Sequence, residues 1–176
     1  MPLQDVSAVD LPGGGPDRTL LDVRAILADE DLRAVNGAVR FLVGLRAALG
    51  RPFGWDAPEQ QIEAHLDASY TPRVRPELVA RSHVAPGSSE CGKRVLYVLE
   101  RETLEEVRNA TVHAFFAEAL VPREDGYRLY VGVYVKPIAW FTRLYMTAIE
   151  PFRRFVVYPA VLARLRERWI ERYPAR

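Results

Sequence analysis

The sequence predicts an α+β fold in which a curved antiparallel β-sheet is covered by a long C-terminal α-helix. Residues 127–136 alternate between apolar and polar side chains, which is the pattern of a half-buried antiparallel strand. Residues 138–173 then repeat apolar side chains every three or four positions, which is typical of an amphipathic helix. Pro137 separates the two patterns, because proline cannot donate to a β-ladder. Pro151 and Pro159 are expected to bend the helix, so that it can follow a curved sheet.

Composition indicates a single soluble domain. The chain has 176 residues, of which 49% are hydrophobic and 27% are charged. A net charge of +1 argues against a nucleic-acid partner, and no apolar run is long enough for stable membrane insertion. Residues 1–10 lack the basic start and apolar run of a signal peptide, so a cytoplasmic location is expected. A homodimer is compatible with these features.

The C-terminal part is basic, with eight arginines against three glutamates in residues 138–176. Such a bias is typical of a solvated helix face, and the alternatives are an acidic partner or an anionic membrane surface. The glycine and proline cluster at 12–16 predicts that residues 1–17 form a flexible N-terminal lead-in to one domain at 18–176. The further elements that we expect are a strand at 19–27, a helix at 29–50, an irregular stretch at 53–92 with a mobile loop at 83–93, and strands at 94–101, 103–107, 109–121 and 127–136.

The predicted hairpin loop at 122–126 determines which side chains share a face of the sheet. If Val121 pairs with Tyr127, His113 lies opposite Val135 and Phe115 lies opposite Val133. This face is nearly all apolar and is therefore expected to point inward. A change of one residue in the loop would reverse the faces.

His113 is the candidate catalytic residue, because a histidine on an inward face can act as a general base or orient a ligand. The alternative is a buried neutral histidine whose hydrogen bonds are satisfied. Asn109 is expected either in a turn or at the mouth of a pocket. Phe141, Tyr145 and Phe152 belong to the core or line a cavity. Arg153 is positioned either to hold a carboxylate or phosphate or to form surface ion pairs.

No cofactor or metal ion is expected. The three histidines and Cys91 have no spacing that is recognised as a zinc site, and the three glycines at 13–15 are not followed by the Gly-Lys-Ser/Thr of a phosphate loop. The sequence contains no Gly-x-Ser-x-Gly elbow. A lone cysteine also excludes an intrachain disulfide.

Three segments carry a resemblance to a known family. They are Arg108 to Phe115 (RNATVHAF), Tyr127 to Pro137, and Leu144 to Pro159 with its Pro-Phe-Arg-Arg run. Together they resemble the bacterial domain-of-unknown-function family DUF2867. That family is similar to the START/Bet v 1-like (SRPBCC, helix-grip) superfamily, which implies a curved antiparallel sheet that grips a C-terminal helix around a cavity. The superfamily includes lipid and hormone carriers as well as polyketide aromatase/cyclases.

These observations predict that the protein binds a small, largely apolar ligand, similar to a lipid or polyketide, between the sheet and the C-terminal helix. A cofactor-independent cyclase, dehydratase or isomerase with His113 as acid/base is the second hypothesis. A protein interaction module with a filled core is the third. The expected ligand-binding residues are Asn109, Phe115, Leu129, Val131, Val133, Phe141, Tyr145, Phe152 and Arg153.

Overall fold

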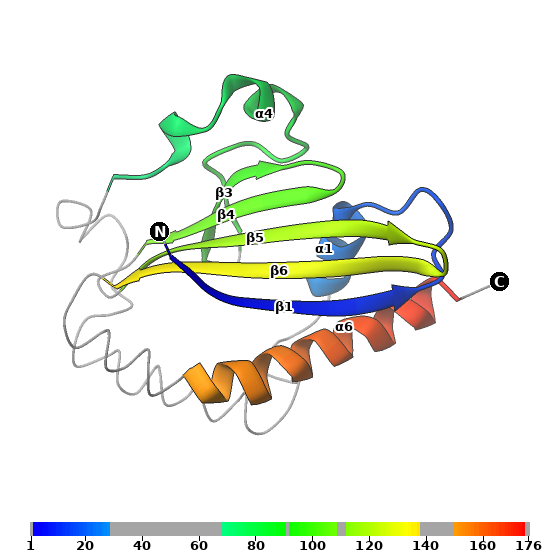
Figure 1. Cartoon of the computed structure of the whole chain (residues 1–176). Helices are drawn as coiled ribbons and strands as arrows, with labels where there is room; N and C mark the ends of the chain where they lie inside the picture. Colours follow the sequence, from blue (N-terminus) through cyan, green and yellow to red (C-terminus); the bar gives the residue numbers. More distant parts are fainter. Residues whose placement is uncertain (1, 29–67, 91, 109–111, 138–149, 175–176) are drawn as a thin grey trace.

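In the described residues, a six-stranded antiparallel sheet forms the centre of the structure. The computed structural model describes residues 2–28, 68–90, 92–108, 112–137 and 150–174. The strands lie in the order β1-β6-β5-β4-β3-β2. Their bounds are β1 Leu3–Pro12, β2 Ser89–Glu90, β3 Lys93–Val98, β4 Glu102–Arg108, β5 Val112–Arg123 and β6 Gly126–Pro137. Helix α6 (Tyr158–Arg172) runs below the sheet in Figure 1, and α1 (Leu20–Ala28), which is seen behind the strands, packs against α6. The 3-10 turn η3 (Thr71–Arg73) and α4 (Pro76–Arg81) lie above the sheet, near β3.

The long C-terminal helix predicted from the sequence is confirmed over the described residues. Helical structure runs without a break from Glu150 to Arg172. Its segment Arg153–Val157, η4, is a π-helix, and α6 continues directly from it. Pro159 explains the wider turn, because it has no N–H to donate to the carbonyl group four residues earlier. The rest of the predicted helix, residues 138–149, lies outside the described residues. The curved sheet and this helix give the helix-grip layout that the sequence predicted.

The N-terminal residues form a strand, so the prediction of a flexible lead-in at 1–17 is wrong for most of its length. Strand β1 pairs antiparallel with β6 from Leu3 to Pro12. Only Leu11 is fully buried, and the outer residues Leu3 and Val6 are each about half exposed (52% and 53%). The sequence pattern is weak because β1 is an edge strand that owes its order to the long ladder with β6.

Residues 20–28 form helix α1, so the predicted strand at 19–27 is also wrong. Leu20, Val23 and Ile26 are buried at a spacing of three, which is helical. A short apolar run can satisfy both periods. The deciding signal precedes it: Asp22 accepts a hydrogen bond from the Thr19 amide at 2.9 Å, and the Thr19 hydroxyl accepts one from the Leu21 amide at 3.2 Å. These bonds resemble a capping box, which satisfies free amides at a helix start.

The four predicted strands between 94 and 136 are confirmed, with small shifts at their ends. The predicted loop at 83–93 contains the short strand β2, and two of its glycines adopt positive φ, 88° at Gly87 and 76° at Gly92. The predicted helix at 29–50 falls outside the described residues.

The register of the β5–β6 hairpin differs by one residue from the predicted one. Pro122, not Val121, pairs with Tyr127, and Arg123 pairs with Gly126 across a two-residue turn. Gly126 is needed at this turn, because its φ is 144° and a Cβ atom there would lie 2.3 Å from the Leu11 carbonyl oxygen. The shift moves Ala114 opposite Val135 and Phe116 opposite Val133. It places His113 and Phe115 on the opposite face from the valines.

The larger of the two hydrophobic cores in the described residues lies where α1 and α6 meet the hairpin end of the sheet. Trp169 and Leu165 of α6 pack against Leu11, Tyr127 and Leu129, and all five are at most 3% exposed. Trp169 also donates a hydrogen bond from Nε1 to the Pro12 carbonyl oxygen at 3.1 Å. This contact attaches the C-terminal helix to the edge strand.

Candidate functional site

The residues predicted to form one site lie on two faces of the sheet. Leu129, Val131 and Val133 are on the face that meets α6, which we call the helix face. His113 and Phe115 are on the other face, next to Tyr70. The expectation that His113 and Phe115 share an inward face with the β6 valines is therefore wrong, and the one-residue shift in the hairpin is the cause.

The remaining predicted residues are in the C-terminal helix or outside the described structure. Phe152 is 51% exposed in the described structure. Arg153 donates a hydrogen bond from Nε to the Tyr158 hydroxyl at 3.1 Å. Asn109, Phe141 and Tyr145 lie outside the described residues. A role for these residues in ligand binding stays a prediction, as does a catalytic role for His113.

Two consecutive glutamates of β4 each lie at the centre of a network of polar side chains in the described structure. Glu105 and Glu106 are each 1% exposed. Adjacent residues of a strand point to opposite faces, so each carboxylate is buried on a different side of the sheet. Buried carboxylates need ion-pair or hydrogen-bond partners, and each of these has several.

On the helix face, Glu105 is held by two cations. Its Oε1 accepts a hydrogen bond from Arg24 Nη1 at 2.6 Å, and its Oε2 pairs with Lys93 Nζ. Arg24 also pairs with Glu90 through Nη2. Burial alone would lower the pKa of Arg24, but its hydrogen bonds with Glu105 and Glu90 raise that pKa above its ordinary value. We call these residues together with Glu118 the helix-face cluster: Arg24, Glu90, Lys93, Glu105 and Glu118.

Glu118 of β5 is a member of the helix-face cluster whose charged form is disfavoured by burial. Burial raises the pKa of its carboxyl group, and the negative charge of Glu105 raises it further, against the opposing effects of Lys93 and Arg24. Its side chain is half-buried. A carboxyl group with a raised pKa keeps its proton to a higher pH than an ordinary glutamate does, and its protonated form can donate a hydrogen bond.

An apolar strip adjoins the cluster on the same face. Ala114, Val133 and Val135 are buried there, with Val107, Phe116 and Tyr158 packed against them. Lys93 connects the two regions, because its Nζ lies 5.4 Å from the centre of the Phe116 ring. The helix face therefore combines a buried apolar strip with charged groups at one side.

The raised pKa of Glu118 predicts a stability difference that grows with pH. Glu118 binds its proton more tightly in the folded chain than in the unfolded chain. The stability that this proton contributes to the wild type is therefore lost as the pH rises through the folded-state pKa of Glu118. Glu118→Gln removes this loss. We expect the melting temperature of the variant, relative to that of the wild type, to rise with pH above about pH 4, the ordinary pKa of a glutamate, measured by differential scanning fluorimetry. Glu124→Gln, in the exposed turn, is the control and should give a flat difference. A difference that shrinks with rising pH would contradict the assignment.

On the opposite face, Glu106 accepts hydrogen bonds at both oxygens. Its Oε1 lies 2.6 Å from His113 Nε2 and accepts from the Tyr70 amide at 3.0 Å. Its Oε2 accepts from the Ser69 hydroxyl at 2.6 Å. The rings of Tyr70 and Phe115 lie 5.9 and 5.1 Å from that of His113, which is 1% exposed. Glu106 and His113 are thus held in place beneath the 69–70 segment.

Sequence reasoning did not single out Glu105 and Glu106, although a signal was present. Residues 103–107 read Thr-Leu-Glu-Glu-Val, so two acidic side chains sit in the middle of a predicted strand. Because both faces of the sheet are covered at this point, both glutamates are buried in either register. Buried acids need partners that come from distant parts of the chain, such as Arg24 and Ser69, and these are not visible from local pattern.

In the described ranges, no group of three or more histidine, cysteine, aspartate or glutamate side chains is arranged to hold a metal ion. None of the helices within those ranges combines the length and the apolar character that crossing a membrane requires.

Comparison with known proteins gives one family assignment. No curated protein matches the chain significantly. The model of a protein family of unknown function, DUF2867, matches residues 1–160. That match covers most of the chain, including every strand of the sheet, both polar centres of β4 and the Pro-Phe-Arg-Arg run. The protein therefore belongs to the DUF2867 family.

Proposed function

We propose that the protein binds a small, largely apolar molecule with one polar end on the helix face, between the sheet and the C-terminal helix. The observation that carries the proposal is the apolar strip of Phe116, Val133 and Val135 beside the helix-face cluster. The apolar body of the ligand would lie along the strip and its polar end beside Lys93 and Glu118. Burial of the apolar part contributes affinity, and the polar groups determine orientation.

The charges of the cluster indicate the kind of polar end. Arg24 and Lys93 carry two positive charges, which Glu90 and Glu105 balance. Burial raises the pKa of Glu118, and the protonated form of this carboxyl group, which leaves the cluster neutral, donates a hydrogen bond. A carbonyl or hydroxyl oxygen that accepts from Lys93 and Glu118 fits this neutral environment better than a charged group does.

The first experiment is native mass spectrometry of the purified protein, followed by denaturing extraction of any molecule that co-purifies. We expect a bound compound with an apolar body and an oxygen-bearing end. Lys93→Gln should lower its retention about tenfold, since a hydrogen bond from a charged group contributes about 1.5 to 3 kcal/mol. Lys136→Gln is the matched control, because the protein has only these two lysines and Lys136 lies on the opposite face.

Two outcomes would overturn the proposal. One is an unliganded mass together with no saturable thermal shift across a panel of lipid-like and polyketide-like compounds, which would favour the interaction module. The other is equal loss of the bound compound in Lys93→Gln and Lys136→Gln, which would place the compound away from the helix face.

A further inference from the structure

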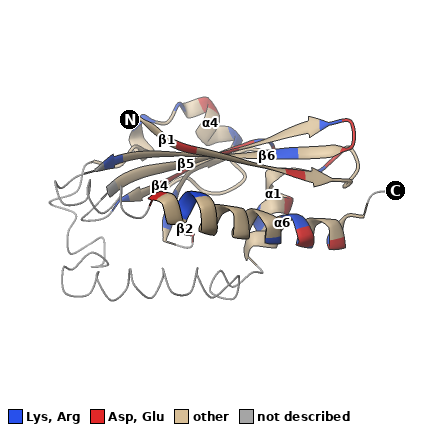
Figure 2. Cartoon of the chain, turned by 60° about the horizontal axis from the view of Figure 1, so that its bottom comes forward, with Lys and Arg blue, Asp and Glu red and all other residues tan. Residues whose placement is uncertain are grey.

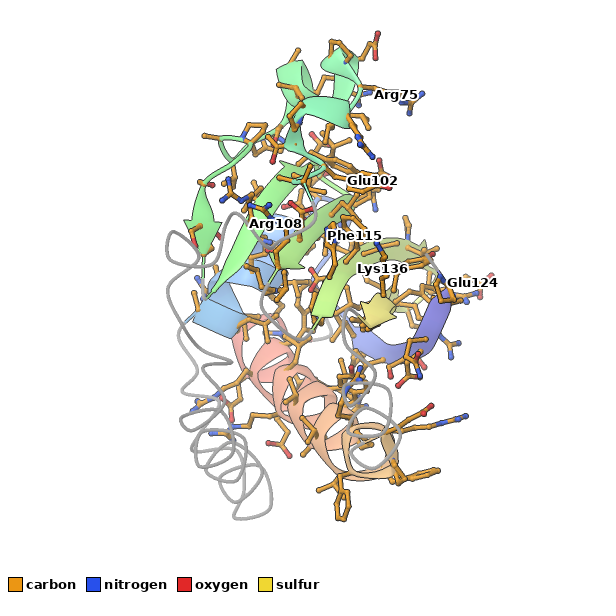
Figure 3. The ribbon with its side chains drawn as sticks, turned by 90° about the vertical axis from the view of Figure 1, so that its left-hand side faces the viewer. Arg75, Glu102, Arg108, Phe115, Glu124 and Lys136 are labelled. Atoms are coloured by element: carbon orange, nitrogen blue, oxygen red, sulfur yellow. The ribbon has the colours of Figure 1, made fainter. Side chains whose placement is uncertain are left out.

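The start of the C-terminal helical stretch exposes two phenylalanine side chains. Phe152 is 51% exposed and Phe155 is 71% exposed, which is the highest exposure among the large hydrophobic side chains of the described residues. Figure 3 shows this start of the helix as an orange ribbon below the strands on which Phe115 and Lys136 are labelled, with side chains that project away from the sheet. A single exposed apolar residue is common, but two aromatic rings three positions apart on one helix form a continuous patch.

The charges along this part of the helix are all positive. Between Glu150 and Glu167 the chain has four arginines and no aspartate or glutamate. Arg154 is exposed, and its guanidinium carbon lies 5.7 Å from the centre of the exposed Phe155 ring. This contact joins two side chains that both face solvent, so it leaves the cation at the surface. A positive charge and two aromatic rings therefore share one exposed region.

The aromatic side chains lie on the side of the helix that points away from the core. Tyr158 packs against the apolar strip of the sheet, and Trp169 is buried in the core at the hairpin end. Phe152, Phe155 and Pro159 are exposed at spacings of three and four, so they follow one outward line along the helix. A partner that covers this line would not disturb the core. We call these exposed residues the Phe-Arg patch: Phe152, Arg154, Phe155 and Pro159.

We propose that the Phe-Arg patch docks onto a membrane surface that contains anionic phospholipids. Aromatic side chains are favoured at the boundary between lipid headgroups and acyl chains, where the apolar ring enters the lipid. Guanidinium groups pair with phosphate oxygens, and a negative surface attracts nearby positive charges. The positive charge of residues 151–166 complements such a surface, and rings that project from the outside of a helix can enter a planar layer together.

The test is co-sedimentation of the full purified chain with large vesicles of phosphatidylcholine mixed with phosphatidylserine. We expect stronger partition onto these vesicles than onto vesicles of phosphatidylcholine alone, and a partition coefficient that falls as sodium chloride is added. Arg154→Gln should lower the coefficient about fivefold, which is the contribution of one basic side chain near an anionic surface. Phe155→Ser should lower it about tenfold, because the ring no longer enters the lipid.

Two variants at the hairpin end of the sheet are the matched controls. Arg123→Gln removes an exposed arginine, and Val121→Ser removes an apolar side chain that is 39% exposed. Both residues lie at the end of β5, outside the Phe-Arg patch, so both partition coefficients should equal that of the wild type. All four substituted side chains are exposed, so each variant should keep the circular dichroism spectrum of the wild type.

Equal partition onto the neutral and the anionic vesicles would overturn the proposal, as would equal effects of Phe155→Ser and Val121→Ser. A dimer that Phe155→Ser dissociates in sedimentation equilibrium, without binding to vesicles, would assign the patch to a second copy of the chain. Saturable binding of poly-glutamate in place of the vesicles would assign it to an acidic protein. Lys93 and the apolar strip are unchanged in all four variants, so these outcomes are independent of the helix-face ligand.

Discussion

Replacing Trp169 with alanine is expected to lower the free energy of unfolding by about 3 to 5 kcal/mol, because it leaves a cavity in the core between α1, α6 and the hairpin. The side chain is fully buried between α1, α6 and the end of the hairpin. It also donates to the Pro12 carbonyl oxygen, which would lose this partner. Urea denaturation followed by circular dichroism measures the change.

Two control variants divide this effect into its parts. Trp169→Phe keeps most of the apolar volume and loses the N–H donor, so it should cost clearly less than the alanine variant. Ile170→Ala alters the next residue, which is 36% exposed, and should change stability by less than about 1 kcal/mol. If Trp169→Ala cost no more than Ile170→Ala, the helix would not be attached through this core.

Strong periodic patterns in the sequence were enough to predict the sheet and its covering helix. Strand β6 alternates over ten residues, and the helix pattern continues to Tyr173. Both patterns are long enough that one ambiguous position does not change the prediction. The errors occurred where the pattern was short or mixed. The apolar run at 20–27 fits both a strand and a helix, and β1 has few buried side chains that would reveal its period.

The candidate site was less predictable, because it depends on register and on partners far along the chain. One residue at the hairpin loop decides whether His113 shares a face with Val135 or with Arg108. The helix-face cluster joins Arg24 to Glu105 across 81 positions, and Ser69 reaches Glu106 across 37. Only the folded chain brings these groups together.

From Arg164 to Glu171, the charged surface of the C-terminal helix has the features of a solvated helix face. Figure 2 shows basic and acidic residues along the ribbon of α6. Arg164 pairs with Glu167 at 3.2 Å and Arg168 pairs with Glu171 at 3.0 Å, and all four side chains are substantially exposed. Exposed pairs three residues apart are typical of a solvated helix face and contribute little to stability.

Substituting the other buried centre, Glu106→Gln, is expected to destabilise the fold by about 3 to 5 kcal/mol, as removal of one partner from a buried polar network does. Both oxygens of Glu106 accept hydrogen bonds, and a glutamine places an NH₂ group where one acceptor is needed. The free energy of unfolding, measured by urea denaturation, reports this loss. Glu102→Gln, at an exposed position of the same strand, should change stability by less than about 0.5 kcal/mol.

A double-mutant cycle with His113→Gln shows whether the histidine and the glutamate act as a unit. Because Nε2 lies 2.6 Å from Oε1, we expect a coupling free energy between about 0.5 and 3 kcal/mol. Additive effects of the two substitutions would mean that Ser69 and the Tyr70 amide account for the buried carboxylate without His113. Strong coupling would instead make Glu106 the group that orients the imidazole, and the segment at 69–70 would then be held to the sheet by a single polar network.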